Sequence, residues 1–258
     1  MLAVLGILVG TGSVVALLSS GQLATEHALA QFKSLGTNLL SVSIMDQSDS
    51  SKSKQSVKEL TLDDVASIKA VSNQIVLAAP YVSSYQSIYI AGIESSAQVV
   101  GADEKLDRIA KIKVAQGRGI SHLDRFSFYC TIGAKLAKKI KEKGVNPLGN
   151  QIIIGKSLFT IIGINQPWKS NFFFYSDIDN GVMIPIEIAQ LIDSNAKIDN
   201  ILFRLVVDPN LVLAQDAIKK KLAAVVPQKK VEFRNPEQII DIVGKQRKTF
   251  TLLLSSIG

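Results

Sequence analysis

The start of the chain constrains its fold most, because the run from Met1 to Ser19 contains no charged residue. A helix needs about 20 mainly apolar residues to cross a hydrocarbon core of about 30 Å. The glycines among the leucines and valines of this run suit helices that pack against one another in lipid. We therefore predict a transmembrane helix at residues 1–19. A secretory signal peptide is the alternative, although its basic leader is missing here.

Residues 20–36 continue the helical pattern beyond this span. Ala28, Leu29, Phe32 and Leu35 share one apolar face, and Gly36 is a residue type that ends helices. The continuous helix would be roughly 50 Å long at 1.5 Å per residue. We therefore predict that residues 20–36 form a stalk that projects from the bilayer.

Residues 235–258 show a predicted stalk helix followed by an apolar run, the reverse of the order at the start of the chain. Asn235 and Pro236 are favoured as N-cap and first residue of a helix. The predicted helix has an apolar face formed by Ile239, Ile240 and Val243. The apolar run TFTLLLSSIG then closes the chain, but it is too short to cross a membrane. We predict a second stalk and the start of a truncated second transmembrane helix, with an ordinary hydrophobic C-terminus as the alternative.

The two predicted stalks can pack as antiparallel partners. The residues that would couple them are Leu29 and Phe32 on the first stalk and Ile239, Ile240 and Val243 on the second. Because the chain opens without a polar leader and closes inside an apolar run, we expect the natural protein to extend further.

The composition of the 258 residues argues against several classes of function. The net charge of +7 comes from lysines spread along the chain, and aromatic residues make up only 6%, so nucleic-acid binding is not expected. The single cysteine, Cys130, has apolar neighbours and reads as a buried, inert thiol. The sequence contains no phosphate-binding loop, nucleophile elbow or metal-ligand spacing. We therefore predict no catalytic, cofactor or metal site and no enzyme activity in this chain.

The periodicities predict an α+β fold between the two ends. Thr61 is expected to cap a helix whose first turn carries Asp63 and Asp64. Further helices are predicted at 132–143 and 211–225, and strands at 38–44, 75–79, 81–93, 200–207 and 230–233. The boundary between the two strands at 75–79 and 81–93 is placed at Pro80.

One aromatic cluster follows Trp168. Phe172, Phe173 and Phe174 precede Tyr175 in a segment that reads as a loop. Two interpretations stay open. The cluster packs as core, or it is exposed as a contact for a partner protein.

Several motifs, taken in order, resemble those of MacB-type ABC transporter permeases. Gly117-Arg118 with Ser121 and Asp124 comes first, Asn146-Pro147-Leu148-Gly149 and QIIIGKSLFTIIGI follow, and Met183-Ile184-Pro185 comes last. The opening LGILVG, ALLSSG and SLGTNLLSV resembles the first membrane helix, stalk and first strand of that family. The similarity covers nearly the whole chain.

The resemblance implies a two-part extracytoplasmic domain on helical stalks. A porter-like α/β subdomain is expected at residues 37–99 and 198–234, and an inserted smaller α/β subdomain at 100–197. The family similarity further implies an ABC ATPase partner, fused or separate, a homodimer or heterodimer of permeases, a possible periplasmic adaptor and a place in the inner membrane. Its function would be to couple ATP-driven helix motion to export or mechanical work. The alternative is a membrane-anchored binding or adhesion domain without a transport role.

Overall fold

The computed structural model describes residues 38–46, 58–171, 173–174 and 176–235. Four residues near the start, Gly12, Ala16, Ser19 and Ser20, are also described and are helical. The rest of the predicted membrane helix, both predicted stalks and the truncated second span lie outside the described residues. In the part of the chain that is described, no helix is both long and apolar enough to cross a membrane.

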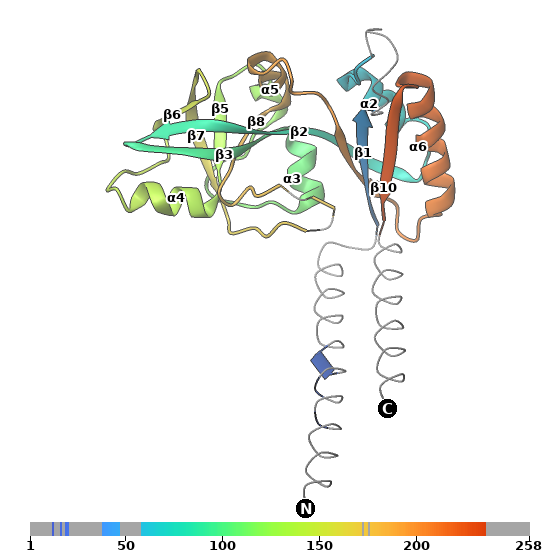
Figure 1. Cartoon of the computed structure of the whole chain (residues 1–258), viewed down its shortest axis with the longest axis horizontal. Coiled ribbons are helices and arrows are strands. Elements are labelled where there is room, and N and C mark those ends of the chain that lie inside the picture. The colour runs from blue at the N-terminus through green and yellow to red at the C-terminus, as the bar shows by residue number, and fades with distance from the viewer. Residues whose placement is uncertain are drawn as a thin grey trace, which may run out of the picture. The chain divides into compact units, whose positions relative to one another are not determined.

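A mixed sheet of ten strands runs through the compact unit Asn38–Arg234 (Figure 1). The strand order is β10-β1-β9-β2-β3-β8-β5-β7-β4, and β6 pairs with β2 and β7. The pairs β3–β8 and β5–β7 are parallel. The strands are β1 (Leu39–Asp46), β2 (Ile75–Ile90), β3 (Ile93–Ala102), β4 (Val114–Gly117), β5 (Tyr129–Ile132), β6 (Gln151–Ile154), β7 (Ser157–Asn165), β8 (Val182–Pro185), β9 (Asn200–Leu205) and β10 (Lys229–Arg234).

The described helices between these strands bury apolar faces on the sheet. They are α2 (Leu62–Lys69), α3 (Glu104–Ala110), α4 (Ala134–Lys141), α5 (Ile186–Ile192) and α6 (Leu211–Val225), with a short 3-10 helix at His122–Asp124. Buried residues of α2, α4, α5 and α6 share one hydrophobic core with the sheet. Thr61 caps α2 as predicted, and its side chain accepts the Asp64 N–H in a capping box. The predicted mixed α/β class is therefore confirmed.

The predicted break at Pro80 is wrong, because β2 runs through it as one strand of 16 residues. Pro80 lies opposite Ile201 of β9, whereas pairing with β3 begins only at Tyr81. Proline has no N–H to donate. It is tolerated here because β2 has a paired neighbour on only one side at this residue.

Other predicted elements agree with the structure to within a few residues. Helix α6 covers the predicted residues 211–225, and its first turn is capped by the Asn210 side chain. Helix α4 is shorter than the predicted 132–143, because Ile132 completes β5 and Gly133 is the N-cap. Cys130 is fully buried, as predicted.

The predicted division into a porter-like and an inserted subdomain stays a prediction. Residues 38–234 form one compact unit, and β3 continues through the predicted boundary at residue 100. Strand β2 pairs with β9 through its first half and with β3 through its second half. This long strand therefore joins the elements of both predicted parts in one sheet.

Candidate functional site

The two ends of the unit Asn38–Arg234 meet at the strand pair β1–β10 (Figure 1). Ser41 lies opposite Arg234 in antiparallel register, so β1 begins beside the point where β10 ends. The Asn38 side-chain amide donates to the Leu205 carbonyl at 2.8 Å, and the Leu205 N–H donates to the Asn38 carbonyl at 2.8 Å. Any segments attached at Asn38 and Asn235 are therefore attached to neighbouring points of one sheet.

An ion cluster fastens the opposite end of the β1–β10 pair. Lys229 Nζ lies 2.8 Å from Asp46 Oδ1 and 2.7 Å from Glu59 Oε2. The other oxygen of Glu59 lies 2.6 Å from Lys197 Nζ. The Lys229 side chain is only 7% exposed. A buried ammonium is energetically costly unless carboxylates pair with it, as Asp46 and Glu59 do here.

The cluster shifts the pKa values of its members toward the charged forms. The hydrogen bond from Lys229 holds the pKa of Asp46 below its ordinary value. Burial acts to raise the pKa of Glu59, but the hydrogen bonds from Lys197 and Lys229 outweigh it and lower the pKa. Burial likewise opposes a raised pKa at Lys229, and Asp46 and Glu59 overcome it. The cluster therefore stabilises the fold at neutral pH and loses this contribution as acid protonates its carboxylates.

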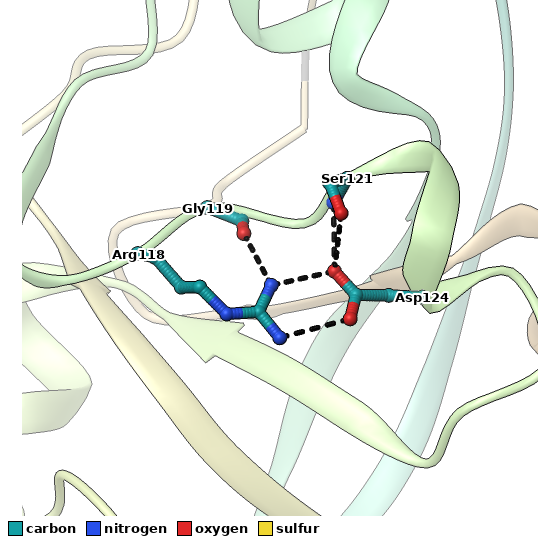
Figure 2. A network of polar contacts seen from close by, with 4 residues as sticks. All are labelled: Arg118, Gly119, Ser121 and Asp124. Atoms are coloured by element: carbon teal, nitrogen blue, oxygen red, sulfur yellow. Dashed lines mark hydrogen bonds and ion pairs between the residues drawn. The ribbon is translucent and has the colours of Figure 1, made fainter.

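A second polar network closes the loop between β4 and β5, residues 118–128 (Figure 2). Arg118 Nη1 and Nη2 donate to Asp124 Oδ2 at 2.6 Å and Oδ1 at 2.9 Å. The N–H and Oγ of Ser121 both donate to Asp124 Oδ2 at 2.9 Å. Arg118 Nη1 also donates to the Gly119 carbonyl at 3.2 Å. A single carboxylate thus holds Arg118, at the start of the loop, together with Ser121 and Asp124.

Asp124 is buried, whereas about half of the Arg118 side chain is exposed. The hydrogen bonds from Arg118, together with those from Ser121, lower the pKa of Asp124 to about 2. The Arg118 guanidinium also lies 5.7 Å from the centre of the Tyr129 ring. Gly117 allows the turn into this loop, because its φ is 75° and a Cβ there would collide with the Ile162 carbonyl.

The closed loop presents large apolar side chains to solvent. Leu123 is 80% exposed and Phe126 is 78% exposed, although both flank the buried Asp124. A fixed loop with exposed apolar side chains can act as a contact for another protein. The sequence pattern does not predict that Leu123 and Phe126 are exposed, because their exposure depends on how the Arg118–Asp124 ion pair folds the loop.

Sequence comparison decides the family. Residues 1–221 match the family described as the MacB-like periplasmic core domain. The chain belongs to this family. The resemblance to MacB-type ABC transporter permeases is therefore confirmed.

Relatives of this MacB-like chain are longer proteins. The probable syringafactin export ATP-binding/permease protein SyfD of Pseudomonas syringae pv. tomato is 26% identical, and the match covers 100% of this chain and 38% of SyfD. The macrolide export ATP-binding/permease protein MacB of Burkholderia pseudomallei is 27% identical, and the match covers 100% of this chain and 39% of that protein. The chain therefore spans about two fifths of the length of these relatives.

Solved structures support the MacB-like fold. The periplasmic region of MacB from Actinobacillus actinomycetemcomitans has a TM-score of 0.65 at 19% identity, and the match covers 81% of this chain and 94% of that one. The extracellular domain of the ABC-type transporter YknZ from Gram-positive bacteria has a TM-score of 0.60 at 14% identity, covering 77% of this chain and 100% of that one. These likenesses concern the fold.

Two residues of the aromatic cluster of this MacB-like domain, Phe173 and Phe174, lie in the core. Phe173 and Phe174 are 1% and 0% exposed. The Phe174 ring makes edge contacts with Tyr81 at 4.9 Å and with Trp168 at 5.3 Å between ring centres. These two residues therefore do not form the exposed partner contact that was one of the two interpretations, because the loop folds back over the sheet. Phe172 lies outside the described residues, as do Leu29, Phe32, Ile239, Ile240 and Val243.

No cluster of three or more possible metal ligands occurs within the described ranges. One buried carboxyl, Asp107 on α3, has a pKa raised to about 7 by burial and by the nearby charges of Asp103 and Glu104. Its Oδ1 is buried and has no hydrogen-bond partner among the residues that the structure describes.

We expect Asp124→Asn to lower the free energy of unfolding by about 2 kcal/mol at pH 7, and by less to the extent that water screens the half-exposed Arg118. The Asp124 pKa is lower in the folded chain than in the unfolded chain. Its contribution is therefore present above about pH 4 and is lost as the pH falls toward 2. Urea unfolding followed by the fluorescence of Trp168, the single tryptophan, measures this difference.

Asp216→Asn is the matched control, because Asp216 is an exposed residue of α6. We expect it to change the free energy of unfolding by no more than about 0.5 kcal/mol. Equal effects of the two substitutions at pH 7, or a difference that persists at pH 2, would contradict the role given to Asp124.

Proposed function

We propose that this MacB-like domain is the extracytoplasmic part of an ABC export permease in the inner membrane. In this proposal it transmits ATP-driven movement of membrane helices to the outside of the membrane. The family match and the names of two relatives, which refer to syringafactin and macrolide export, support a role in export. We therefore propose a cargo of the kind that these relatives are named for, such as a macrolide or a syringafactin.

The observation that carries the transmission step is the strand pair β1–β10. The unit begins at Asn38, three residues before Ser41, and Ser41 lies opposite the last residue, Arg234. The cluster of Lys229, Asp46 and Glu59 fastens the other end of the pair. Strand β1 also pairs with β9, which in turn pairs with the long strand β2. A displacement applied at Asn38 and Asn235 would therefore pass through hydrogen-bonded strands into the whole sheet.

The energy for this movement would come from an ABC ATPase, either fused to this chain in the complete protein or supplied as a separate subunit. The relatives are named as ATP-binding/permease proteins, which supports an ATPase in the same assembly. We further propose that two permease copies assemble, as a homodimer or heterodimer, and that a periplasmic adaptor can join them. The exposed side chains of Leu123 and Phe126 are the contact that we propose for that adaptor.

We expect cells that express the complete transporter to accumulate less of at least one compound from a panel of a macrolide, a syringafactin and a pyoverdine, the last because another relative is named as a pyoverdine exporter. The host must lack its own exporters of these compounds. The reduction should disappear when ATP hydrolysis is blocked with vanadate. Equal accumulation of all three compounds with and without the transporter would contradict the export proposal.

We expect Phe32→Ala together with Ile240→Ala to abolish export in the same cells while ATP hydrolysis continues. If both side chains are buried between the proposed stalks, the pair of substitutions removes roughly 3 to 8 kcal/mol of packing. The outer domain has its own core and should still fold. Lys219→Ala together with Lys220→Ala, on the exposed face of α6, is the control and should leave export unchanged. Full export by the stalk variant would show that these helices do not couple the two sides of the membrane.

A further inference from the structure

Strand β4 ends the sheet and leaves one of its backbone edges without a neighbouring strand. The strand order places β4 last, and it pairs only with β7 among the described strands. Ala115, Gln116 and Gly117 are exposed. An open edge presents N–H and C=O groups that can pair with another chain.

The two edges of this sheet differ in how they are protected. Strand β10, at the other end, reads KKVEFR, with charged side chains at four of its six positions. Strand β4 reads VAQG and contains neither a charged residue nor a proline. Charges and prolines on an edge discourage pairing with other chains. The β4 edge therefore lacks the protection that the β10 edge has.

A groove of about 440 Å³ lies between β4 and helix α4. Its walls include Ala115 of β4, Ala134 and Ala137 of α4, and Ile164 of β7. The small side chains on α4 leave this space open above the edge of the sheet. A strand added to β4 would place every second side chain in this groove, because side chains alternate between the two faces of a strand.

The rim of the groove is mainly basic. Lys138 and Lys141 line it together with one acidic residue, Glu142. Lys139 and Lys143 lie on the same stretch of chain, and Lys113 precedes β4. Lys135 is paired with Asp179 at 3.8 Å, but Lys138 and Lys141 form no salt bridge with another described residue. The positive potential at the rim favours a ligand that carries carboxylates.

We propose that the β4 edge and its groove bind an extended acidic segment of a partner protein by strand addition. The backbone of the segment would pair with β4, its alternate apolar side chains would enter the groove, and its carboxylates would face Lys138 and Lys141. Binding of a bare anion or a membrane surface would use the lysines but neither the open edge nor the groove. This site is independent of the proposed export function and of the Leu123–Phe126 contact.

The test uses the full chain in lipid nanodiscs and a capped, fluorescein-labelled peptide of about eight residues that alternates valine and glutamate. A second peptide has glutamine in place of glutamate. A third keeps the glutamates but carries an N-methyl group on every backbone amide, so that neither of its edges can donate hydrogen bonds to β4. Because β4 is only four residues long, we expect a Kd of roughly 10 to 100 µM for the first peptide by fluorescence anisotropy. The glutamine peptide should bind about tenfold more weakly, and the N-methylated peptide should not bind.

Two charge-matched variants locate the site. Lys138→Glu with Lys141→Glu changes the rim, whereas Lys139→Glu with Lys143→Glu makes the same change of charge on residues that do not line the groove. We expect the first pair to weaken binding about tenfold or more and the second pair by less than about threefold. Hydrogen exchange should slow at residues 113–117 when the peptide binds. Absence of saturable binding, equal binding of the N-methylated peptide, equal effects of the two variants, or unchanged exchange at β4 would each overturn the proposal.

Discussion

Replacing Phe174 with alanine is expected to lower the free energy of unfolding by about 3 to 5 kcal/mol, because its side chain is fully buried. Part of this loss comes from its edge contacts with Tyr81 and Trp168. Such ring pairs stabilise a fold by more than the burial of their apolar area alone. Tyr81 belongs to β2 and Trp168 follows β7, so the ring joins two distant parts of the chain. Urea unfolding of the full chain in detergent solution measures the loss.

Phe126→Ala is the matched control for this prediction. Phe126 is the same residue type but is 78% exposed, so its removal should change the free energy of unfolding by no more than about 0.5 kcal/mol. A loss below about 1 kcal/mol for Phe174→Ala would contradict its place in the core. Weaker binding of a partner protein by a Phe174→Ala chain of unchanged stability would favour the contact interpretation instead.

The burial of Phe174 and the exposure of Phe126 could not be predicted from the sequence pattern. Phe174 stands in an irregular segment without periodicity, so neither burial nor exposure can be predicted for it. Its burial follows from contacts with residues far away in the chain, such as Tyr81. Phe126 also stands in an irregular segment, the loop closed by Arg118 and Asp124, and it is exposed.

Regular amphipathic segments behave differently. Helix α6 was predictable to the residue, because Ala214, Ile218 and Leu222 recur at helical spacing behind the cap Asn210. The predicted strand break at Pro80 was wrong, because a proline breaks a strand only where its missing N–H is needed for a hydrogen bond to a neighbouring strand. That need depends on which strands lie on either side, which is a property of the sheet. The family motif at Arg118 and Asp124 pointed to the loop, but their ion pair could be seen only in the structure.

The second large expected effect is on export. Inserting a flexible glycine–serine segment of about six residues between Thr37 and Asn38 should reduce export at least tenfold in the complete transporter. Glycine–serine linkers behave as flexible coils and transmit little displacement. The insertion lies outside the sheet, so Asn38 can keep its bonds to Leu205 and the domain should still fold. ATP hydrolysis should stay within about twofold of the wild type, because the insertion changes no residue of the proposed ATPase.

The same insertion at the turn between Gly155 and Lys156 is the control. Both residues are exposed and join β6 to β7, so a longer turn is tolerated there at little cost. We expect this variant to export normally. It separates the loss of mechanical connection from a general effect of extra residues on expression or folding.

The amount of compound exported per ATP hydrolysed, measured in membrane vesicles, shows whether movement reaches the outer domain through β1 and β10. We expect this ratio to fall at least tenfold for the insertion before Asn38 and to stay at the wild-type value for the insertion at Gly155. An unchanged ratio for both insertions would contradict the claim that movement reaches the outer domain through β1 and β10.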